Sequence, residues 1–245
     1  MAMVKIYGER NTNTNYLSQL IALNLDAFEI PGTVPPYAMR AQRYLPGKEA
    51  VRDVYFKLTA RRNLGWKHTY VDYNKISKHS LATKVSTYIT ITKNPYSWLL
   101  SLYRKPYHFR GASDLSFEAF LESEWKTIGR DNIGDQANPI ELWNVKNRSY
   151  FSLGQDKSLL TTTEKILEDP EWIINQISEK GGINKRSNIF INFDQSTKEA
   201  DKDNKYYRDY YLNERWKEDL TQKAIEIINR SLDAGLATHF GYNIL

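Results

Sequence analysis

The stretch ITITKNPYSWLLSLY, residues 89–103, decides how the chain folds, because it joins a strand pattern directly to a helix pattern. β-branched side chains dominate the strand part, from Val85 onward, which is typical of a buried strand. Asn94 is a favourable N-cap residue, and Pro95 suits the first helical position, where its missing N–H costs nothing. Lys93 is left at the carboxyl end of the strand, where ligands of open α/β sheets bind and where a helix N-terminus favours anions. The junction predicts an anion site, with an ordinary strand-to-helix connection as the alternative.

A similar junction begins the chain. Residues 4–7 predict a strand, and the polar loop GERNTNTN follows as residues 8–15, ahead of an amphipathic helix. The loop is comparable to the phosphate-binding pattern G-x-x-x-x-G-K-[ST], whose first position Gly8 fills. The last three named positions of the pattern hold other residues, which are Asn13, Thr14 and Asn15. Because Asn can adopt the left-handed conformation that glycine often provides, the loop predicts a P-loop in outline without the triphosphate-binding lysine. The alternative is an ordinary polar loop.

The remaining patterns predict an α/β fold with a mostly parallel central sheet and helices on both faces. Further strands are predicted at residues 25–30, 64–71, 158–163 and 189–193. Further helices are predicted at residues 73–83, 115–121, 139–153, 169–182, 206–211 and 216–236, whereas residues 37–63 are predicted to be irregular and to lie on the surface. No internal repeat or linker is recognisable, so the sequence predicts one domain over residues 1–245.

Composition narrows the classes of function. Over 245 residues the formal net charge is +5, which suits an anionic ligand but is too small and too dispersed to predict nucleic-acid binding. The chain has no cysteine, which excludes disulfides, thiol catalysis and cysteine-bound zinc, and its 4 histidines are scattered, so no metal site is expected. No apolar run is long enough to span a membrane, and residues 1–7 lack a signal-peptide pattern, so the expected location is the cytoplasm.

Three features follow one another along the chain: the P-loop-like turn, a Lys-His pair at residues 67–68, and Lys-Asn-Pro at residues 93–95 with Ser101 eight residues after the lysine. This order resembles the sulfotransferases that use 3'-phosphoadenosine 5'-phosphosulfate (PAPS). In that family a first loop, typically Lys-Ser-Gly-Thr-Thr-Trp, cradles the 5'-phosphosulfate. A later Arg-Asn-Pro, with a serine eight residues after its arginine, holds the 3'-phosphate, and residues 93–103 match this second motif closely. The resemblance implies the three-layer architecture of P-loop NTPases.

The resemblance also implies roles for individual residues. His68 is the implied general base, with His108 as the second candidate. Arg10 is the candidate for stabilising the charge of the leaving group, and Lys67, next to His68, is the third catalytic candidate. Neighbours on a strand face opposite ways, so only one of Lys67 and His68 is expected to point into the site unless the strand has ended. The residues implied to bind the nucleotide are Arg10, Asn11, Thr12, Asn13, Thr14, Asn15, Tyr16, Lys93 and Ser101.

The chain departs from the family pattern at several positions. Lys93 replaces the usual arginine, which keeps the charge but loses the bidentate fork. In the first loop the family's lysine would fall on Asn11, and Asn13 stands for the glycine. Tyr16 takes the place of the tryptophan that stacks on adenine. The family's late Arg-Lys-Gly motif has no clear copy, and the candidates to replace it are Lys198, Lys202 and Lys205.

The sequence thus predicts a sulfotransferase that moves the sulfuryl group of PAPS to a hydroxyl or amine acceptor, either a carbohydrate or a small metabolite. One alternative is a P-loop kinase-like enzyme that uses a nucleoside triphosphate. It would need a lysine and a Ser or Thr in the first loop and a Walker B aspartate, and Thr14 and Asn15 argue against it. A third possibility is a non-catalytic relative that retains the fold and the nucleotide.

Overall fold

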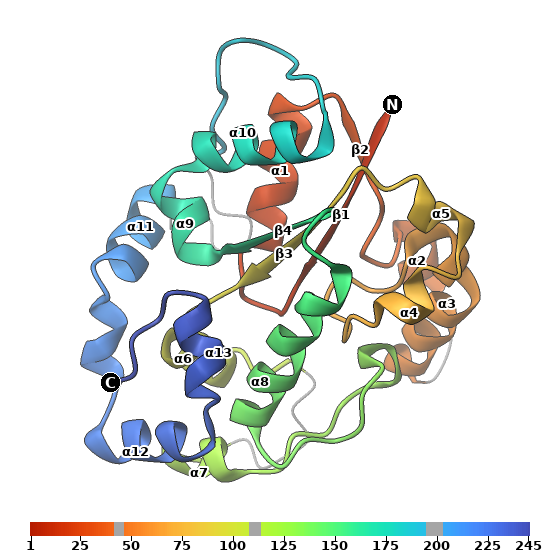
Figure 1. The fold of residues 1–245 in the computed structure, drawn as a ribbon. Helices are drawn as coiled ribbons and strands as arrows, with labels where there is room; N and C mark the ends of the chain where they lie inside the picture. The colour runs from red at the N-terminus through yellow and green to blue at the C-terminus, as the bar shows by residue number, and fades with distance from the viewer. Residues whose placement is uncertain (42–46, 108–113, 195–202) are drawn as a thin grey trace.

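A single parallel sheet organises the fold (Figure 1), in a computed structural model that describes residues 1–41, 47–107, 114–194 and 203–245. In this part of the chain four strands pair in the order β2-β1-β3-β4. They are β1 (Ala2–Gly8), β2 (Ala27–Glu29), β3 (Thr87–Thr92) and β4 (Ser158–Thr162). Every neighbouring pair is parallel, which confirms the predicted parallel α/β sheet. All residues of β3 are buried, as its run of β-branched side chains predicted.

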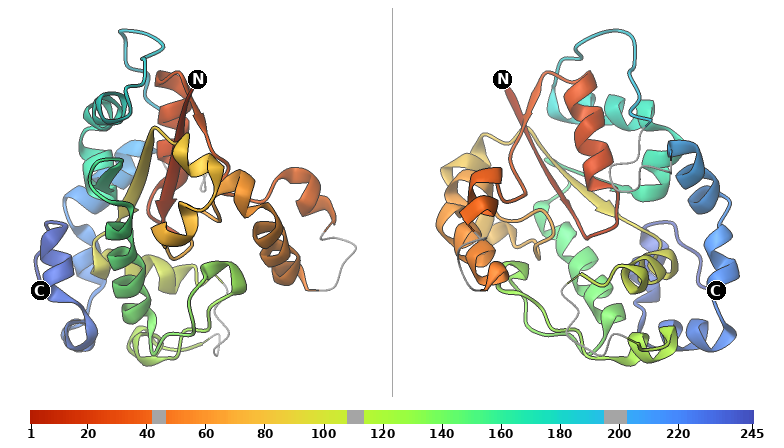
Figure 2. Two further views of the ribbon diagram at one scale, coloured as in Figure 1. Left: turned by 45° about the vertical axis from the view of Figure 1, so that its right-hand side comes forward. Right: turned by 180° about the vertical axis from the view of Figure 1, so that it is seen from behind.

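Helices cover both faces of the sheet, because alternate side chains of the central strands enter two different hydrophobic clusters. Val4 and Ile6 of β1 pack with α1 (Thr14–Asn24) and α10 (Pro170–Gly181). Tyr7, the residue after Ile6, packs on the opposite side. The elements of that side are α4 (Tyr73–Ile76), α5 (Ser80–Thr83) and the 3-10 helix η2 (Tyr150–Leu153). Seen from behind in Figure 2, α1 lies across the sheet, and the helices on the two faces confirm the predicted layers.

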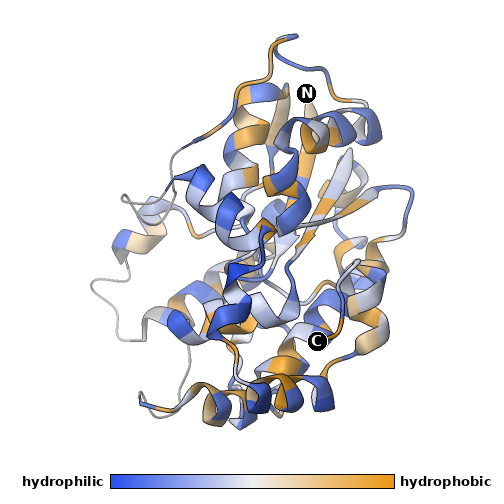
Figure 3. Ribbon diagram, turned by 90° about the vertical axis from the view of Figure 1, so that its left-hand side faces the viewer, coloured by the Kyte–Doolittle hydropathy of each residue, from blue (hydrophilic) through white to orange (hydrophobic). Residues whose placement is uncertain are grey.

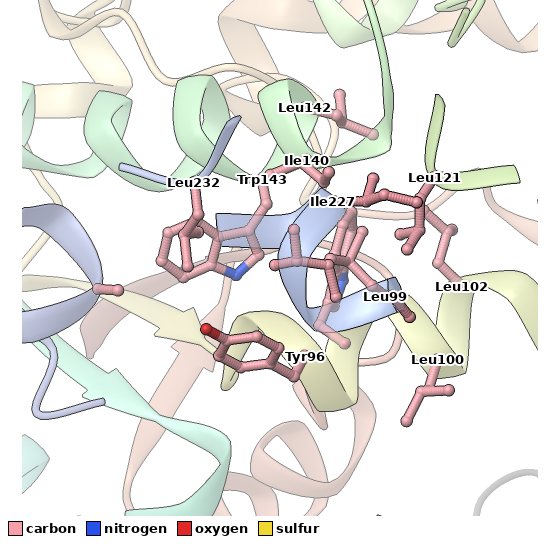
Figure 4. Close-up of a cluster of buried hydrophobic side chains, with 14 of the residues drawn as sticks. Tyr96, Leu99, Leu100, Leu102, Leu121, Ile140, Leu142, Trp143, Ile227 and Leu232 are labelled. Carbon is pink, nitrogen blue, oxygen red and sulfur yellow. The ribbon is translucent and has the colours of Figure 1, made fainter. Parts of the chain in front are cut away.

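The largest hydrophobic cluster lies beyond the carboxyl end of β3 (Figure 4). It contains the buried side chains of Trp98, Trp143 and Trp216. Its helices are α6 (Pro95–Arg104), α7 (Phe117–Glu122), α8 (Pro139–Ser149), α12 (Gln222–Ser231) and α13 (Ala234–His239). Hydrophobic and hydrophilic residues alternate along the helices in Figure 3, as expected of helices with one face in a core. Since α6 begins where β3 ends, this core fixes the junction around Lys93.

The prediction of irregular structure for residues 37–63 is wrong. Two helices occupy most of this region, α2 (Pro36–Ala41) and α3 (Lys48–Asn63), and they extend away from the sheet in Figure 2. The sequence of α3 is rich in good helix formers such as Lys, Arg and Ala but has no continuous apolar stripe, so its periodicity is weak. Phe56 anchors α3 by packing with Trp66 and Ile128. Among the described helices, none has the length and apolar character needed to cross a membrane.

Two predicted strands are also wrong. Residues 64–71 form turns, because Leu64 and Gly65 both take left-handed conformations, with φ of 56° and 86°. Residues 189–193 run outside the sheet without regular structure. The predicted helix at 73–83 is split into α4 and α5, and the predicted helix at 216–236 is divided among the 3-10 helix η3 (Arg215–Asp219), α12 and α13. The last two helices near the sheet edge are α9 (Thr163–Glu168) and α11 (Asn204–Leu212).

Candidate active site

A cavity of about 470 Å³ lies where the loop after β1 meets the helix after β3. Its cationic lining residues are Arg10, Arg52, Lys67, Arg104, Lys105 and Arg130. Among the described residues, no Asp or Glu lines it. Helix α11 contributes an aromatic wall made of Tyr206, Tyr207, Tyr210 and Tyr211. A hollow lined by charge of one sign favours a ligand of the opposite sign, so this cavity fits an anion with a planar part.

The first loop turns tightly into helix α1. Asn11 and Asn13 have φ of 65° and 60°, so Asn13 does take the left-handed conformation that glycine provides in the phosphate-binding pattern. Asn13 is also the N-cap of α1, and Thr14 and Asn15 line the cavity at the helix N-terminus with it. Backbone N–H groups at such a terminus favour an anion. Gly8 is required by close packing, because a Cβ there would lie 3.0 Å from the Ile91 carbonyl oxygen.

Two predicted contacts of the first loop have structural partners of their own. The Thr12 hydroxyl donates to the Glu9 carbonyl oxygen at 2.6 Å, and the residue is buried inside the loop rather than lining the cavity. Tyr16 does line the cavity, and its hydroxyl donates to Asn192 Oδ1 at 2.8 Å while Asn204 Nδ2 donates to it at 3.1 Å. The Tyr16 ring is therefore held in place at the wall.

Hydrogen bonds from Lys5 on β1 stabilise the turn that carries Lys67 and His68. It follows the C-terminus of α3, where the chain reverses through Leu64. Lys5 Nζ donates to the carbonyl oxygens of Asn63 at 2.6 Å and Gly65 at 2.8 Å. A cation at a helix C-terminus satisfies carbonyl groups that have no partner within the helix. Since these residues form a turn and not a strand, Lys67 and His68 are not forced to opposite faces, and both line the cavity.

The His68 ring is held through one of its two nitrogens. Its Nδ1 lies 2.5 Å from the Gly8 carbonyl oxygen. Because a carbonyl only accepts, Nδ1 carries the proton in this contact and Nε2 keeps its lone pair. Burial lowers the pKa of His68 well below 6.5, and the nearby positive charges of Lys67 and Arg10 lower it further. His68 is therefore neutral at pH 7 and able to accept a proton.

Lys67 and Arg10 bring positive charge to the same end of the cavity. Lys67 Nζ donates to Asn15 Oδ1 at 2.5 Å, and burial lowers the pKa of Lys67. The Arg10 guanidinium lies 4.5 Å from the centre of the Trp66 ring and 3.3 Å from Glu9 Oε1. Its Nη2 is buried and has no hydrogen-bond partner among the described residues. A buried guanidinium nitrogen without a partner at the edge of a cavity is a donor left for a ligand.

A buried charge network behind the cavity was not predicted from the sequence. Lys146 Nζ, on α8, donates to the His68 carbonyl oxygen at 2.5 Å and lies 2.5 Å from Asp131 Oδ1 and 3.1 Å from Glu9 Oε2. Burial raises the pKa of Asp131, but the charges of Lys146 and Arg10 outweigh it, so the pKa of Asp131 is lowered. Nothing in the apolar pattern of α8 marks Lys146, whereas Glu9 lies inside the polar loop beside Arg10.

The junction after β3 forms as predicted. Asn94 is the N-cap of α6, and its side chain accepts from the backbone N–H of Tyr96 at 3.1 Å. Lys93 Nζ donates to Ser101 Oγ at 2.8 Å, so the two residues eight positions apart do meet. Ser101 lines the cavity. Lys93 is only 1% exposed, because the ring of Tyr211 covers its ammonium group.

Other predicted residues lie away from this arrangement or outside the described residues. His108, Lys198 and Lys202 fall in the stretches that the structure does not describe. Lys205 is exposed on α11 and does not line the cavity.

A comparison with models of protein families finds no match for this chain, and a comparison with curated proteins finds none either. Among solved structures, the sulfotransferase domain of the Synechococcus PCC 7002 olefin synthase is similar over 100% of this chain and 95% of its own, with 16% identity and a TM-score of 0.48. The sulfotransferase domain from the curacin biosynthetic pathway is similar over 100% of this chain and 99% of its own, with 9% identity and a TM-score of 0.44. Both are domains of the class that the sequence motifs resemble. At this level of similarity the chemistry of the cavity has to be inferred from its own side chains.

Proposed function

We propose that the chain is a PAPS-dependent sulfotransferase, formed by one domain over residues 1–245, that acts on a hydroxyl or amine of a carbohydrate or small-molecule acceptor. The observation that carries the proposal is the meeting of a neutral His68 with Lys67 and Arg10 in one cationic cavity at the N-terminus of α1. A proton acceptor and positive charge are the two requirements of sulfuryl transfer. The acceptor must lose its proton, and the departing phosphate must be stabilised.

His68 Nε2 accepts the proton of the acceptor as the acceptor's oxygen or nitrogen bonds to sulfur. Bound PAPS supplies an activated sulfuryl group whose bond to the 5'-phosphate oxygen breaks in the same step. Lys67 Nζ and Arg10 stabilise the charge that develops on that oxygen, and the N-terminus of α1 adds its backbone N–H groups. Gly8 fixes the His68 ring through Nδ1, so the same nitrogen faces the acceptor in each turnover.

The residues of the cavity fit such a polyanion. Arg10 Nη2 is buried without a partner among the described residues, and the cationic lining has no carboxylate in it. Thr14 and Asn15 would contact the phosphosulfate, while Tyr16 would lie along the adenine, as the family resemblance implies. Lys93 and Ser101 would hold the 3'-phosphate, with Lys93 acting as a point charge rather than a fork.

Calorimetry with 3',5'-diphosphoadenosine and ATP separates this proposal from the kinase-like alternative. We expect the diphosphate to bind at least about tenfold more tightly, because only the diphosphate offers a 3'-phosphate to Lys93. Tight binding of ATP with no binding of the diphosphate would overturn the proposal.

Turnover of sulfur-labelled PAPS with a panel of hydroxyl and amine acceptors separates an enzyme from a non-catalytic relative. We expect label to move to at least one acceptor class. Binding of the diphosphate without transfer to any acceptor, and without slow hydrolysis of PAPS, would favour the non-catalytic relative.

A further inference from the structure

The predicted phosphate-binding pair of Lys93 and Ser101 is complete but covered. Lys93 Nζ lies 2.8 Å from Ser101 Oγ and 3.9 Å from the centre of the Tyr211 ring. The Tyr211 hydroxyl lies 3.4 Å from Ser101 Oγ. One tyrosine therefore contacts both members of the pair, in the way that a phosphate oxygen would have to contact them.

The surroundings polarise the Tyr211 hydroxyl toward an anion. Burial raises the pKa of Tyr211 and the carboxylate of Glu164 raises it further, but the Lys93 ammonium and hydrogen bonds from Lys93 and Ser101 outweigh both, so the pKa is lowered from 10.0. The same lysine that would attract a phosphate oxygen thus also stabilises the ionised form of the phenol at this position.

The structure has space next to Tyr211 for a second side-chain position. It lines the catalytic cavity and, on its other side, a second cavity of about 550 Å³ that includes Asn94, Trp216 and Tyr242. Helix α11, which carries Tyr211, has no fully buried residue. Its neighbour along the helix face, Tyr207, stacks on Tyr211 with ring centres 6.3 Å apart. Tyr211 packs against the edges of two hydrophobic clusters, but it is only partly buried and has a cavity on each side. Such a side chain can change rotamer at a smaller cost than a fully buried one.

We propose that Tyr211 occupies the 3'-phosphate position when no nucleotide is bound and that the phosphate displaces it toward the second cavity. This inference rests on the proposed function for the identity of the anion. It makes Tyr211 a specificity-determining residue. When the bound nucleotide has no 3'-phosphate, Tyr211 stays over Lys93. When it has a 3'-phosphate, Lys93 loses its cation–π contact with Tyr211 and gains an ion pair with the phosphate.

The test compares 3',5'-diphosphoadenosine with 5'-AMP, which lacks the 3'-phosphate, on the whole protein. Tyr211→Ala should tighten binding of the diphosphate by roughly threefold to tenfold, which is the worth of one cation–π contact, and leave 5'-AMP unchanged. Tyr211→Phe keeps the ring but loses the hydroxyl and should give a smaller gain. Tyr206→Ala removes a tyrosine from the same helix and should change both affinities by the same factor. Weaker diphosphate binding by Tyr211→Ala, or equal changes for both nucleotides, would overturn the proposal.

A second measurement works even if neither nucleotide binds, an outcome that would refute the proposed function itself. The ultraviolet titration difference between the natural protein and Tyr211→Phe reports the Tyr211 phenol alone. Without ligand, this phenol should ionise below pH 10.0, and inorganic phosphate should move its ionisation upward by separating it from Lys93. Absence of phosphate binding in both the natural protein and Tyr211→Ala, or binding that leaves the titration unchanged, would show that Tyr211 covers no anion site.

Discussion

The loop after β1 and the junction after β3 both border the cationic cavity, but they relate to their sequence motifs in opposite ways. The first loop departs from the family pattern at Asn11 and Asn13, yet Asn13 and the next three residues line the cavity. The second junction matches its motif closely, yet Lys93 is covered by Tyr211. A sequence motif indicates the local backbone conformation. Whether its side chains can reach a ligand depends on residues that are distant in the sequence.

The largest effect is expected from replacing His68, the proposed base, which is hydrogen-bonded to Gly8 at the start of the first loop. His68→Ala should lower turnover by about 10²- to 10⁴-fold, because no other described side chain in the cavity has a neutral imidazole to accept the proton. Affinity for 3',5'-diphosphoadenosine should stay nearly unchanged, as measured by calorimetry beside a turnover assay. His79→Ala is the matched control, since His79 does not line the cavity, and it should leave both quantities unaltered. Unchanged turnover in His68→Ala would remove this residue from the mechanism.

The pH dependence of turnover should reflect the lowered pKa of His68. The pKa of His68 is lowered, so the base remains unprotonated below pH 6.5 and is lost only when the pH falls through its lowered pKa. The acid limb of the kcat profile should therefore lie below pH 6.5. An acid limb above that value would mean that another group limits the rate.

The buried charge network supports the first loop but not the second junction. Lys146→Met leaves the carboxylates of Glu9 and Asp131 buried without their shared cation, and it should lower the free energy of unfolding by about 3–5 kcal/mol. Denaturant unfolding measures the loss. Arg148→Met, on the same helix, breaks an exposed ion pair with Asp233 and should cost less than about 1 kcal/mol. Similar small losses in both variants would argue against a network that holds His68.

Lys93 tests the second junction directly. Lys93→Ala should weaken binding of 3',5'-diphosphoadenosine by about 10- to 100-fold, because it removes one charge-assisted contact. Lys93→Arg should preserve or strengthen binding, since the fork can contact the phosphate at two points. Binding of 5'-AMP serves as the control and should be equal in all three proteins. A uniform loss with both nucleotides would place the effect in folding rather than in the phosphate contact.

The smallest expected effect is on stability, at Asn13, which stands where the family pattern has a glycine. Asn13 has a φ of 60°, so Asn13→Ala should lower stability by about 1 kcal/mol, the cost of a left-handed alanine. Asn13→Gly should be neutral within about 0.5 kcal/mol, because glycine adopts this conformation without strain. Thermal unfolding of the two variants gives the comparison. Equal stability of the alanine and glycine variants would mean that the loop relaxes to another shape.

Local signals explain what could be predicted from the sequence. The strand at β3 and the cap of α6 depend on neighbouring residues, namely a β-branched run, Asn94 and Pro95, and the structure has both. The meeting of Lys93 with Ser101 agrees with the eight-residue spacing of the family motif, in which Lys93 precedes α6 and Ser101 lies within it. Placing His68 and Lys67 in the cavity came from the family resemblance rather than from any local pattern.

The errors and omissions arise from contacts that are distant in sequence. Residues 64–71 look like a strand, because aromatic and β-branched residues alternate there, but Lys5 and the left-handed Leu64 shape them into a turn. Helix α3 has too few apolar residues for its period to be recognised. No local sequence pattern distinguishes Lys146 or Tyr211. Each is defined by a contact with a residue far away in the sequence, Lys146 with Glu9 and Tyr211 with Lys93.

The bonds from Lys5 have a consequence for the order in which the molecule assembles. Lys5 and Gly65 are separated by 60 positions, and the turn that their hydrogen bond stabilises carries Lys67 and His68. Closing so long a loop is entropically costly and slow compared with forming a helix, so the contact arises with the sheet rather than before it. The native turn around His68 therefore depends on contacts from the first strand. An isolated fragment that begins after that strand would contain His68 without the contacts from Lys5 and Gly8 that orient it.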